Sequence, residues 1–273
     1  MIANKKVALV IGAQGGIGKA TAALLCERGW YVIAADVQFE EGYAPSINET
    51  VEQIQIDITN DSSAKAAFDR ISQRTGGLDA VIHAAGILQI GSMVELPIDK
   101  LQQALDINLL GVYRINQIFL PLILKRRGRI IHLSSEVGTQ TAAPFNGMYS
   151  ITKHALEAYS DALRRELMFL GIEVIKIQPG PIKTSMTKSG EDLFAEAERN
   201  SVHFKKQLNK GRSYLPSVYR DAHEPMVVAE IVLKALESKS PRIAYRVVQD
   251  TTRRLLDLLP DKWSDKLIKY FLS

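Results

Sequence analysis

Tyr149 and Lys153 stand four residues apart in the segment SSEVGTQTAAPFNGMYSITK, residues 134–153. On a helix, residues at this spacing share one face, with about 6 Å between their Cβ atoms. A phenol with a pKa of about 10 is protonated at neutral pH and is therefore a poor base. A lysine ammonium beside it favours the phenolate, so the pair could exchange a proton with an alcohol or carbonyl oxygen. Such pairs are common on helix surfaces, so the surrounding elements decide the interpretation.

The pattern of apolar segments predicts those elements. Short Val/Ile-rich segments, typical of buried strands, occupy residues 6–11, 31–35, 53–56, 79–83, 129–134, 173–178 and 242–248. Segments with helical periodicity lie between them, at residues 17–29, 62–75, 98–109, 111–126, 149–170 and 226–238. This alternation predicts an α/β fold: a single-domain, doubly wound Rossmann-type sandwich with a seven-stranded parallel sheet and helices on both faces. Tyr149 would then lie near the carboxyl edge of the sheet.

A glycine-rich turn follows the first predicted strand and opens the first helix. Its sequence is VIGAQGGIGKA, with glycines at Gly12, Gly15, Gly16 and Gly18. Without Cβ atoms, the backbone can approach a pyrophosphate at a helix N-terminus, where free N–H groups and the helix dipole favour anions. The position between strand and helix predicts a nucleotide site.

Asp36 ends the second predicted strand and indicates which nucleotide binds. An acidic side chain there accepts hydrogen bonds from the adenosine ribose hydroxyls and repels a 2′-phosphate. Neither Gln14 nor Val37 supplies a compensating cation. The sequence therefore predicts NAD(H) as the cofactor rather than NADP(H).

Together these motifs resemble the classical short-chain dehydrogenase/reductase family, over nearly the whole chain. IGAQGGIG is similar to the family's cofactor turn, with Ile11 where a threonine is usual. HAAG resembles its Asn-x-Ala-Gly segment, with His83 in place of asparagine, and QIDIT, INLLG and QPGPIKT resemble further family segments. PFNGMYSITKHALEAYSDALRREL and PRIAYRVVQD resemble the hydroxysteroid- and retinol-dehydrogenase-like members.

The resemblance implies roles for individual residues. Tyr149 would be the general acid/base, and Lys153 would hold the nicotinamide ribose and lower the pKa of the tyrosine. Asn108 would support the lysine and an ordered water, and a serine would hydrogen-bond the substrate oxygen. The residues expected to contact the cofactor are Gly12, Gly15, Gly16, Ile17, Gly18, Asp36, Asp57, Ile58, Ala84, Ala85, Gly86, Tyr149, Lys153, Pro179, Gly180, Ile182 and Thr184.

The identity of the active serine depends on the alignment. Counting back from Tyr149 by the commonest family interval reaches Glu136, whereas SSEVG resembles the family's Ser-Ser-x-x-Gly and selects Ser135. Because loops absorb insertions more readily than strand ends shift register, we predict Ser135. Ser134 is then expected to pack on the other face, and Glu136 to point away or line the substrate mouth. His83 is expected to hydrogen-bond between strands.

Composition limits the remaining functions. The chain has 273 residues, 46% of them apolar, and its single cysteine, Cys26, excludes an intramolecular disulfide and a thiolate zinc cluster. A reducing compartment, the cytoplasm, is predicted. The five histidines show no ligand spacing, so no metal is expected. The first apolar segment is too short for a secretory signal or a membrane span. Acids dilute the basic tail, so no nucleic-acid partner is predicted.

Two segments depart from the alternation, although residues 1–273 are predicted to form one domain. Residues 185–224 form a predicted substrate lid, and residues 250–273 a helical tail with apolar stripes. Both favour a hydrophobic alcohol or carbonyl substrate, such as a steroid, a retinoid or another lipid-like molecule. For the last helix, packing on its own domain or across a subunit interface is favoured over contact with a membrane surface.

Three further readings complete the expectations. A 3-oxoacyl-type carbonyl reductase is an alternative, which Asp36 disfavours because such reductases usually employ NADPH. A catalytically silent NAD-sensing or scaffold protein is a second alternative, disfavoured because Tyr149, Lys153 and Asn108 are all present. The resemblance also implies a homo-oligomer, a dimer or tetramer, formed through the helices at 111–126 and 149–170.

Overall fold

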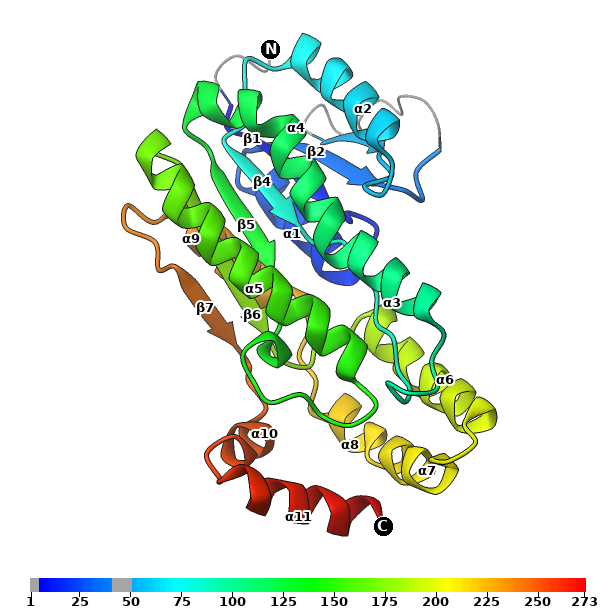
Figure 1. Ribbon diagram of the computed structural model, residues 1–273. Coiled ribbons are helices and arrows are strands. Elements are labelled where there is room, and N and C mark those ends of the chain that lie inside the picture. Colours follow the sequence, from blue (N-terminus) through cyan, green and yellow to red (C-terminus); the bar gives the residue numbers. More distant parts are fainter. Residues whose placement is uncertain (1–4, 41–50) are drawn as a thin grey trace.

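The computed structural model describes residues 5–40 and 51–273; residues 1–4 and 41–50 of the predicted domain lie outside the described part. It confirms a seven-stranded parallel sheet in the order β3-β2-β1-β4-β5-β6-β7 (Figure 1). The strands are β1 (Val7–Ile11), β2 (Tyr31–Asp36), β3 (Val51–Gln55), β4 (Ala80–His83), β5 (Arg129–Leu133), β6 (Glu173–Pro179) and β7 (Ala244–Val247). The chain order reverses between β1 and β4, the place where such sheets bind ligands.

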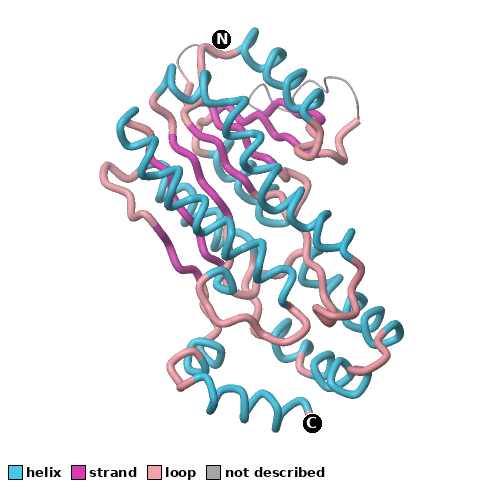
Figure 2. The backbone as a smooth tube through the Cα atoms, viewed as in Figure 1, coloured by secondary structure: helices cyan, strands magenta, loops and turns pink. Residues whose placement is uncertain are grey.

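Helices cover both faces of the sheet, which explains why its strands are apolar almost throughout (Figures 1 and 2). One face carries α1 (Gly16–Glu27) and α9 (Pro225–Glu237), which pack against each other over one buried core. The other face carries α2 (Asp61–Arg74), α4 (Gly111–Arg126) and α5 (Gly147–Leu167), over a second core.

The two helices predicted at 98–109 and 111–126 form one continuous run. It consists of α3 (Ile98–Leu105), a π-helical turn at Asp106–Leu110, and α4. By length and composition alone, this run could cross a membrane. Here Ile115, Phe119 and Ile123 are fully buried within the second core, which accounts for the apolar sequence.

The segments predicted as lid and tail are helical. The first contains α6 (Ser185–Asn200), α7 (Lys205–Ser213) and α8 (Leu215–Arg220), and the tail contains α10 (Thr251–Leu256) and α11 (Asp261–Leu272). All five helices gather beyond the carboxyl edge of the sheet, where α11 packs on α7 (Figure 1). They therefore flank the edge at which Tyr149 lies.

Candidate active site

The glycine turn is a close-fitting cradle between β1 and α1. A Cβ atom on Gly12, whose φ is +81°, would lie 2.4 Å from the nitrogen of Ala85, and one on Gly18 would lie 2.1 Å from the oxygen of Gly12. Gly15 caps α1 without a side-chain hydrogen bond, and no acidic residue occupies the first turn. The helix therefore begins with N–H groups suited to an anion, so the turn fits the pyrophosphate of a dinucleotide.

Substitution of Gly18 by alanine tests this cradle. Since the new Cβ overlaps the Gly12 carbonyl, we expect loss of dinucleotide binding and a decrease of about 1–3 kcal/mol in the free energy of unfolding. Denaturant unfolding and nucleotide titration measure the two effects. Gly76→Ala is the matched control, because its Cβ would meet only the tip of Arg126, at 3.9 Å. Equal behaviour of the two variants would contradict the cradle.

The two aspartates expected near the adenosine differ in their surroundings. Asp36 is buried at the end of β2, and its two carboxylate oxygens accept hydrogen bonds from the backbone nitrogens of Gln14 (2.9 Å) and Gln38 (3.0 Å). It therefore ties the glycine turn to the end of β2. Asp57 follows β3 and accepts from both the nitrogen and the hydroxyl of Thr59, at 2.8 and 2.7 Å.

The other expected cofactor residues lie on segments that follow neighbouring strands. Ala84, Ala85 and Gly86 continue from β4, and the nitrogen of Ala84 donates to the oxygen of Ile11 at 2.8 Å. A Cβ on Gly16 would lie 2.8 Å from the Thr184 methyl, so the segment after β6 contacts the glycine turn. This last segment also contains Pro179, Gly180 and Ile182. Of the two isoleucines, Ile17 packs on the first core and Ile58 packs under α4. The structure thus brings these segments together at one edge.

Tyr149 and Lys153 share one side of α5, as their spacing predicts. The Lys153 ammonium lies 5.6 Å from the centre of the Tyr149 ring and donates a hydrogen bond of 2.9 Å to the carbonyl oxygen of Leu133. That carbonyl belongs to the end of β5, so Lys153 connects the helix to the sheet edge. The lysine is buried, whereas Tyr149 keeps some accessible surface.

A lowered pKa is expected for Tyr149 from the sequence, but burial raises it instead. Desolvation dominates at both groups: it raises the pKa of Tyr149 to about 12, against a lowering contribution from a hydrogen bond with Ser135. Burial also lowers the pKa of Lys153 to about 8, against a raising contribution from Glu157. The tyrosine is therefore a phenol at neutral pH, suited to donate a proton.

The serine beside Tyr149 is Ser135. It supplies the side-chain hydrogen bond that acts on the Tyr149 hydroxyl, and its own hydroxyl lies 3.5 Å from the oxygen of Pro179. Ser134 lies differently: its hydroxyl is buried, near Gly138, with no hydrogen-bond partner among the described residues. The geometry agrees with the alignment that selects Ser135.

The two adjacent serines provide a matched pair of variants. Ser135→Ala removes a donor from the site, so we expect kcat to decrease about 10²-fold. Ser134→Ala removes an unpartnered buried hydroxyl, so activity and stability should both be retained. Steady-state kinetics of the two variants, with thermal unfolding as a check on the fold, measures the difference. Retention of activity by Ser135→Ala and its loss by Ser134→Ala would reverse the assignment.

Asn108 lies in the π-helical turn and is buried. Its amide accepts from the nitrogen of Ile87 (2.8 Å) and donates to the oxygen of Ile87 (2.9 Å) and to the hydroxyl of Thr152 (3.0 Å). Asn108 thus joins the segment after β4 to the helix of Lys153 through Thr152, rather than through the lysine itself. Thr152, which sequence reasoning missed, is the residue directly before Lys153.

Sequence reasoning also missed a buried ion pair one turn beyond Lys153. Glu157 accepts a hydrogen bond from Gln178 Nε2 at 2.9 Å and pairs with Lys176 Nζ at 2.9 Å. Lys176 also contacts Asp161, at 2.8 Å. The spacing of Lys153 and Glu157 on α5 was the available signal, but nothing in the sequence placed Lys176 and Gln178 opposite.

His83 is structural, but its partner differs from the expected one. Instead of a neighbouring strand, Nε2 contacts Asn116 Oδ1 on α4 at 2.8 Å, and Asn116 also contacts His132 at 3.0 Å. Burial lowers the pKa of His83 to about 4. The imidazole is therefore neutral, and its bond holds α4 to the sheet.

Glu136 faces the tail. Its carboxylate is buried and accepts a hydrogen bond of 2.8 Å from the nitrogen of Asp250, and burial raises its pKa. A second bond, of 3.0 Å, joins the nitrogen of Thr141 to Asp257. The loop between Ser135 and Tyr149 is therefore tied to the tail at two points.

This architecture, a parallel sheet with a glycine turn and a Ser–Tyr–Lys group at its carboxyl edge, defines a dinucleotide-binding α/β oxidoreductase. Residues 6–192 match the family described as short chain dehydrogenase, and the chain belongs to that family. Its members are oxidoreductases that use nicotinamide cofactors.

Relatives and solved structures agree over nearly the whole length. The chain is 31% identical over 280 residues to an NADPH-dependent 3-dehydrocapnine reductase of Ornithobacterium rhinotracheale, covering 96% of this chain and 95% of that protein. It is 31% identical over 287 residues to retinol dehydrogenase 7 of Rattus norvegicus, covering 96% and 87%. The crystal structure of a short-chain dehydrogenase from Streptomyces avermitilis superposes with a TM-score of 0.78 at 22% identity, covering 98% and 96%, which supports the fold.

Proposed function

We propose that the protein is an NAD(H)-dependent oxidoreductase that interconverts a hydrophobic secondary alcohol and its carbonyl, with Tyr149 as general acid/base. The observation that carries the proposal is the convergence of Tyr149, Ser135 and Lys153 at the carboxyl edge of the sheet, the edge at which the glycine turn also lies. Asp36 at the end of β2 supports NAD(H) over NADP(H).

In the proposed reaction, Tyr149 donates its phenolic proton to the carbonyl oxygen during reduction and accepts it back during oxidation. Ser135 hydrogen-bonds the same oxygen, and Lys153 places a positive charge near the phenol. A bound nicotinamide dinucleotide supplies or accepts the hydride. Its pyrophosphate would be held by the glycine turn, its adenosine by Asp36 and Asp57, and its nicotinamide end by Lys153 and the segment from Pro179 to Thr184.

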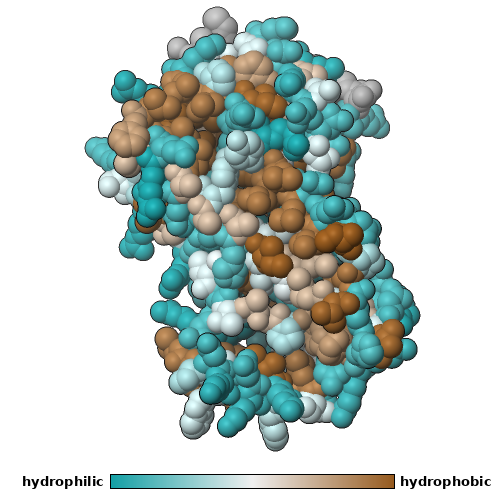
Figure 3. All heavy atoms as spheres, viewed as in Figure 1, coloured by the Kyte–Doolittle hydropathy of each residue, from teal (hydrophilic) through white to brown (hydrophobic). Residues whose placement is uncertain are grey.

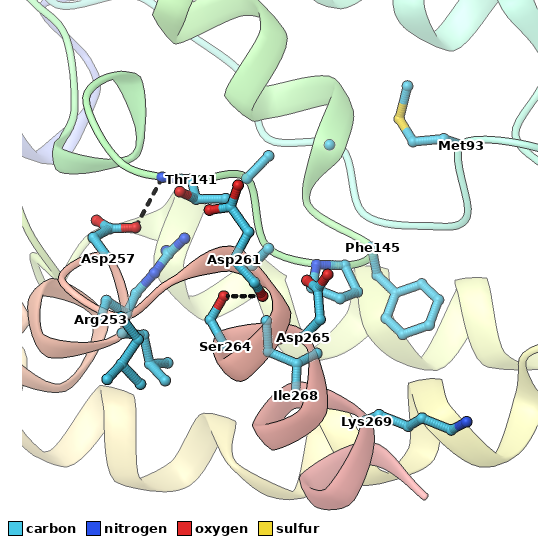
Figure 4. A pocket seen from close by; sticks show the side chains of 16 residues that line it. Met93, Thr141, Phe145, Arg253, Asp257, Asp261, Ser264, Asp265, Ile268 and Lys269 are labelled. Carbon is cyan, nitrogen blue, oxygen red and sulfur yellow. Dashed lines mark hydrogen bonds between the residues drawn. The ribbon is translucent and has the colours of Figure 1, made fainter.

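The substrate is proposed to be lipid-like, such as a steroid or retinoid. A cavity of about 450 Å³ lies between the tail and residues 141–147 (Figure 4). Its apolar walls include Met93, Phe145, Leu256 and Ile268, and its edge reaches Gly147, at the start of the helix that carries Tyr149. The four proposed catalytic residues do not line it, so we assign it as the approach to the site, with α6–α8 as the lid.

The face formed by α4 and α5 supports the proposed homo-oligomer. Apolar surface is exposed by Tyr113 and Leu124 on α4, by Ile151 on α5, and by Leu110 in the π-helical turn that precedes α4. Figure 3 shows hydrophobic side chains gathered over the same face. An exposed apolar face of this kind suits a two-fold contact with a second copy.

We place the protein in the cytoplasm, since its single cysteine suits a reducing compartment.

The first experiment is a fluorescence titration of the purified protein with NADH and, separately, with NADPH. Tight NADH binding with weak NADPH binding supports the proposal and leads to a screen of steroid and retinoid alcohols with NAD⁺. Preferred NADPH binding would favour the second candidate, a carbonyl reductase, which the name of the Ornithobacterium relative also suggests. Binding of neither nucleotide would favour a silent scaffold.

Glu157 provides a test of the charge on Lys153. Because Glu157 raises the pKa of Lys153, Glu157→Gln is expected to lower that pKa further below about 8. As the pH rises, Lys153 should then lose its proton at a lower pH than in the parent protein. Activity that depends on the Lys153 ammonium should fall at that lower pH. A pH profile of kcat/KM measures the shift. Glu166→Gln, an exposed carboxylate on the same helix, is the control, and identical profiles for all three proteins would contradict the coupling.

A further inference from the structure

The outward side of α11 combines aromatic residues with lysines. Trp263 and Tyr270 are 67% and 77% exposed, and Leu267 is 38% exposed. Lys262 and Lys266 are exposed beside them. At 3.6 residues per turn, these five residues fall on one arc of the helix. If the helix only packed on its own domain, this arc would be buried. Instead, the arc is exposed and faces away from the domain.

The acidic residues of α11 lie on its other side. Asp261 and Asp265 line the cavity opposite residues 141–147, together with Ser264 and Ile268 (Figure 4). The spacing of these four residues is that of a single helix face. Both carboxylates line the cavity, so the charged residues of the outward arc itself are the lysines Lys262 and Lys266.

The neighbouring helix is also basic. α7 packs against α11, and its charged residues are all basic: Lys205, Lys206, Lys210 and Arg212. Glu198 pairs with Arg212 at 3.4 Å, while Lys205 and Lys206 are exposed. Hydrophilic side chains and hydrophobic patches alternate at this end of the molecule (Figure 3).

We propose that the outward arc of α11, comprising Lys262, Trp263, Lys266, Leu267 and Tyr270, docks on an anionic lipid membrane surface. Lysines meet the negative headgroups, and Trp and Tyr suit the headgroup level, where one end of a ring is wet and the other apolar. Charge selects this partner over a second copy of the chain, since a two-fold contact through the arc would set lysines against lysines.

Docking would also place the cavity between the membrane and Tyr149. The cavity lies directly behind α11 and has apolar walls, so a lipid-like molecule could pass from the bilayer toward the site (Figure 4). This last step rests on the proposed function, whereas membrane docking itself does not.

The test uses the full-length protein with vesicles of phosphatidylcholine alone or mixed with phosphatidylserine. The chain has two tryptophans, and Trp30 is buried, so a blue shift of the emission on adding vesicles reports Trp263. We expect the shift and co-sedimentation with phosphatidylserine vesicles only, both weakened by salt. The double variant Lys262→Glu/Lys266→Glu should lower the partition coefficient at least about tenfold.

The matched control is Lys125→Glu/Lys239→Glu, which changes the net charge equally at exposed positions. Lys125 lies at the end of α4 before β5, and Lys239 lies between α9 and β7, so both are at the amino edge of the sheet, away from the tail. This control should bind vesicles as the parent protein does, and Trp263→Ala should bind weakly. The proposal is overturned if the protein does not bind vesicles, or if all variants bind them equally. It is also overturned if the protein self-associates and Trp263→Ala abolishes that self-association. NADH titration of the same samples measures nucleotide binding independently. A failure of the proposed function can therefore be distinguished from a failure of membrane docking.

Discussion

Tyr149→Phe is expected to lower kcat/KM by about 10³-fold while leaving the fold unchanged. Positioned proton transfer contributes about 10²–10⁴-fold to rate, and phenylalanine retains the ring without the proton. The phenol, with a pKa raised to about 12, is protonated throughout the physiological range, so it can act directly as the acid in reduction. Oxidation needs the phenolate, so the oxidation rate of the parent protein should rise with pH. Steady-state kinetics in both directions measures these effects.

Tyr159→Phe is the control for that experiment. Tyr159 lies on the same helix, and its hydroxyl accepts a hydrogen bond of 3.1 Å from Asn116, away from the proposed site. Its loss should cost about 1 kcal/mol of stability and little activity. If Tyr149→Phe retains more than about a tenth of the parent rate, proton transfer by this residue is not the source of catalysis.

The sheet and the positions of the motifs could be predicted because they depend on local pattern. Buried parallel strands are apolar on both faces, and a glycine turn between strand and helix has one principal use. The spacing of Tyr149 and Lys153 placed both on one helix face, as the structure shows. These features need no knowledge of what packs opposite them.

The features that sequence reasoning missed depend on distant partners. Glu136 is bound by the backbone of Asp250, far along the chain, and Glu157 meets Lys176 and Gln178 on a strand that follows it. The pKa of Tyr149 was expected to fall because the lysine was visible in the sequence, while the burial that raises it was not. Desolvation depends on what surrounds the residue in the folded protein. The motif alone therefore predicts the wrong direction for the pKa shift of Tyr149.

Asp36→Asn is expected to shift the preference for NADH over NADPH toward NADPH by about 10²-fold. A hydrogen bond to a charged group is worth about 1.5–3 kcal/mol, or roughly 10- to 100-fold in affinity, and its loss should weaken NADH binding. Removal of the carboxylate charge should at the same time strengthen NADPH binding, because the repulsion of the 2′-phosphate disappears. Fluorescence titration with both nucleotides gives the ratio of dissociation constants.

Two features of the site sharpen this comparison. Asp36 also accepts from the nitrogens of Gln14 and Gln38, and asparagine can keep only one of these bonds well, so thermal unfolding must accompany the titration. Asp57→Asn makes the same change of charge at the neighbouring position, where the carboxylate binds Thr59. It should affect both nucleotides alike, because only Asp36 is proposed to meet the 2′ position. An unchanged ratio in Asp36→Asn, or equal shifts in both variants, would assign the selectivity to the general charge of the site instead of to Asp36.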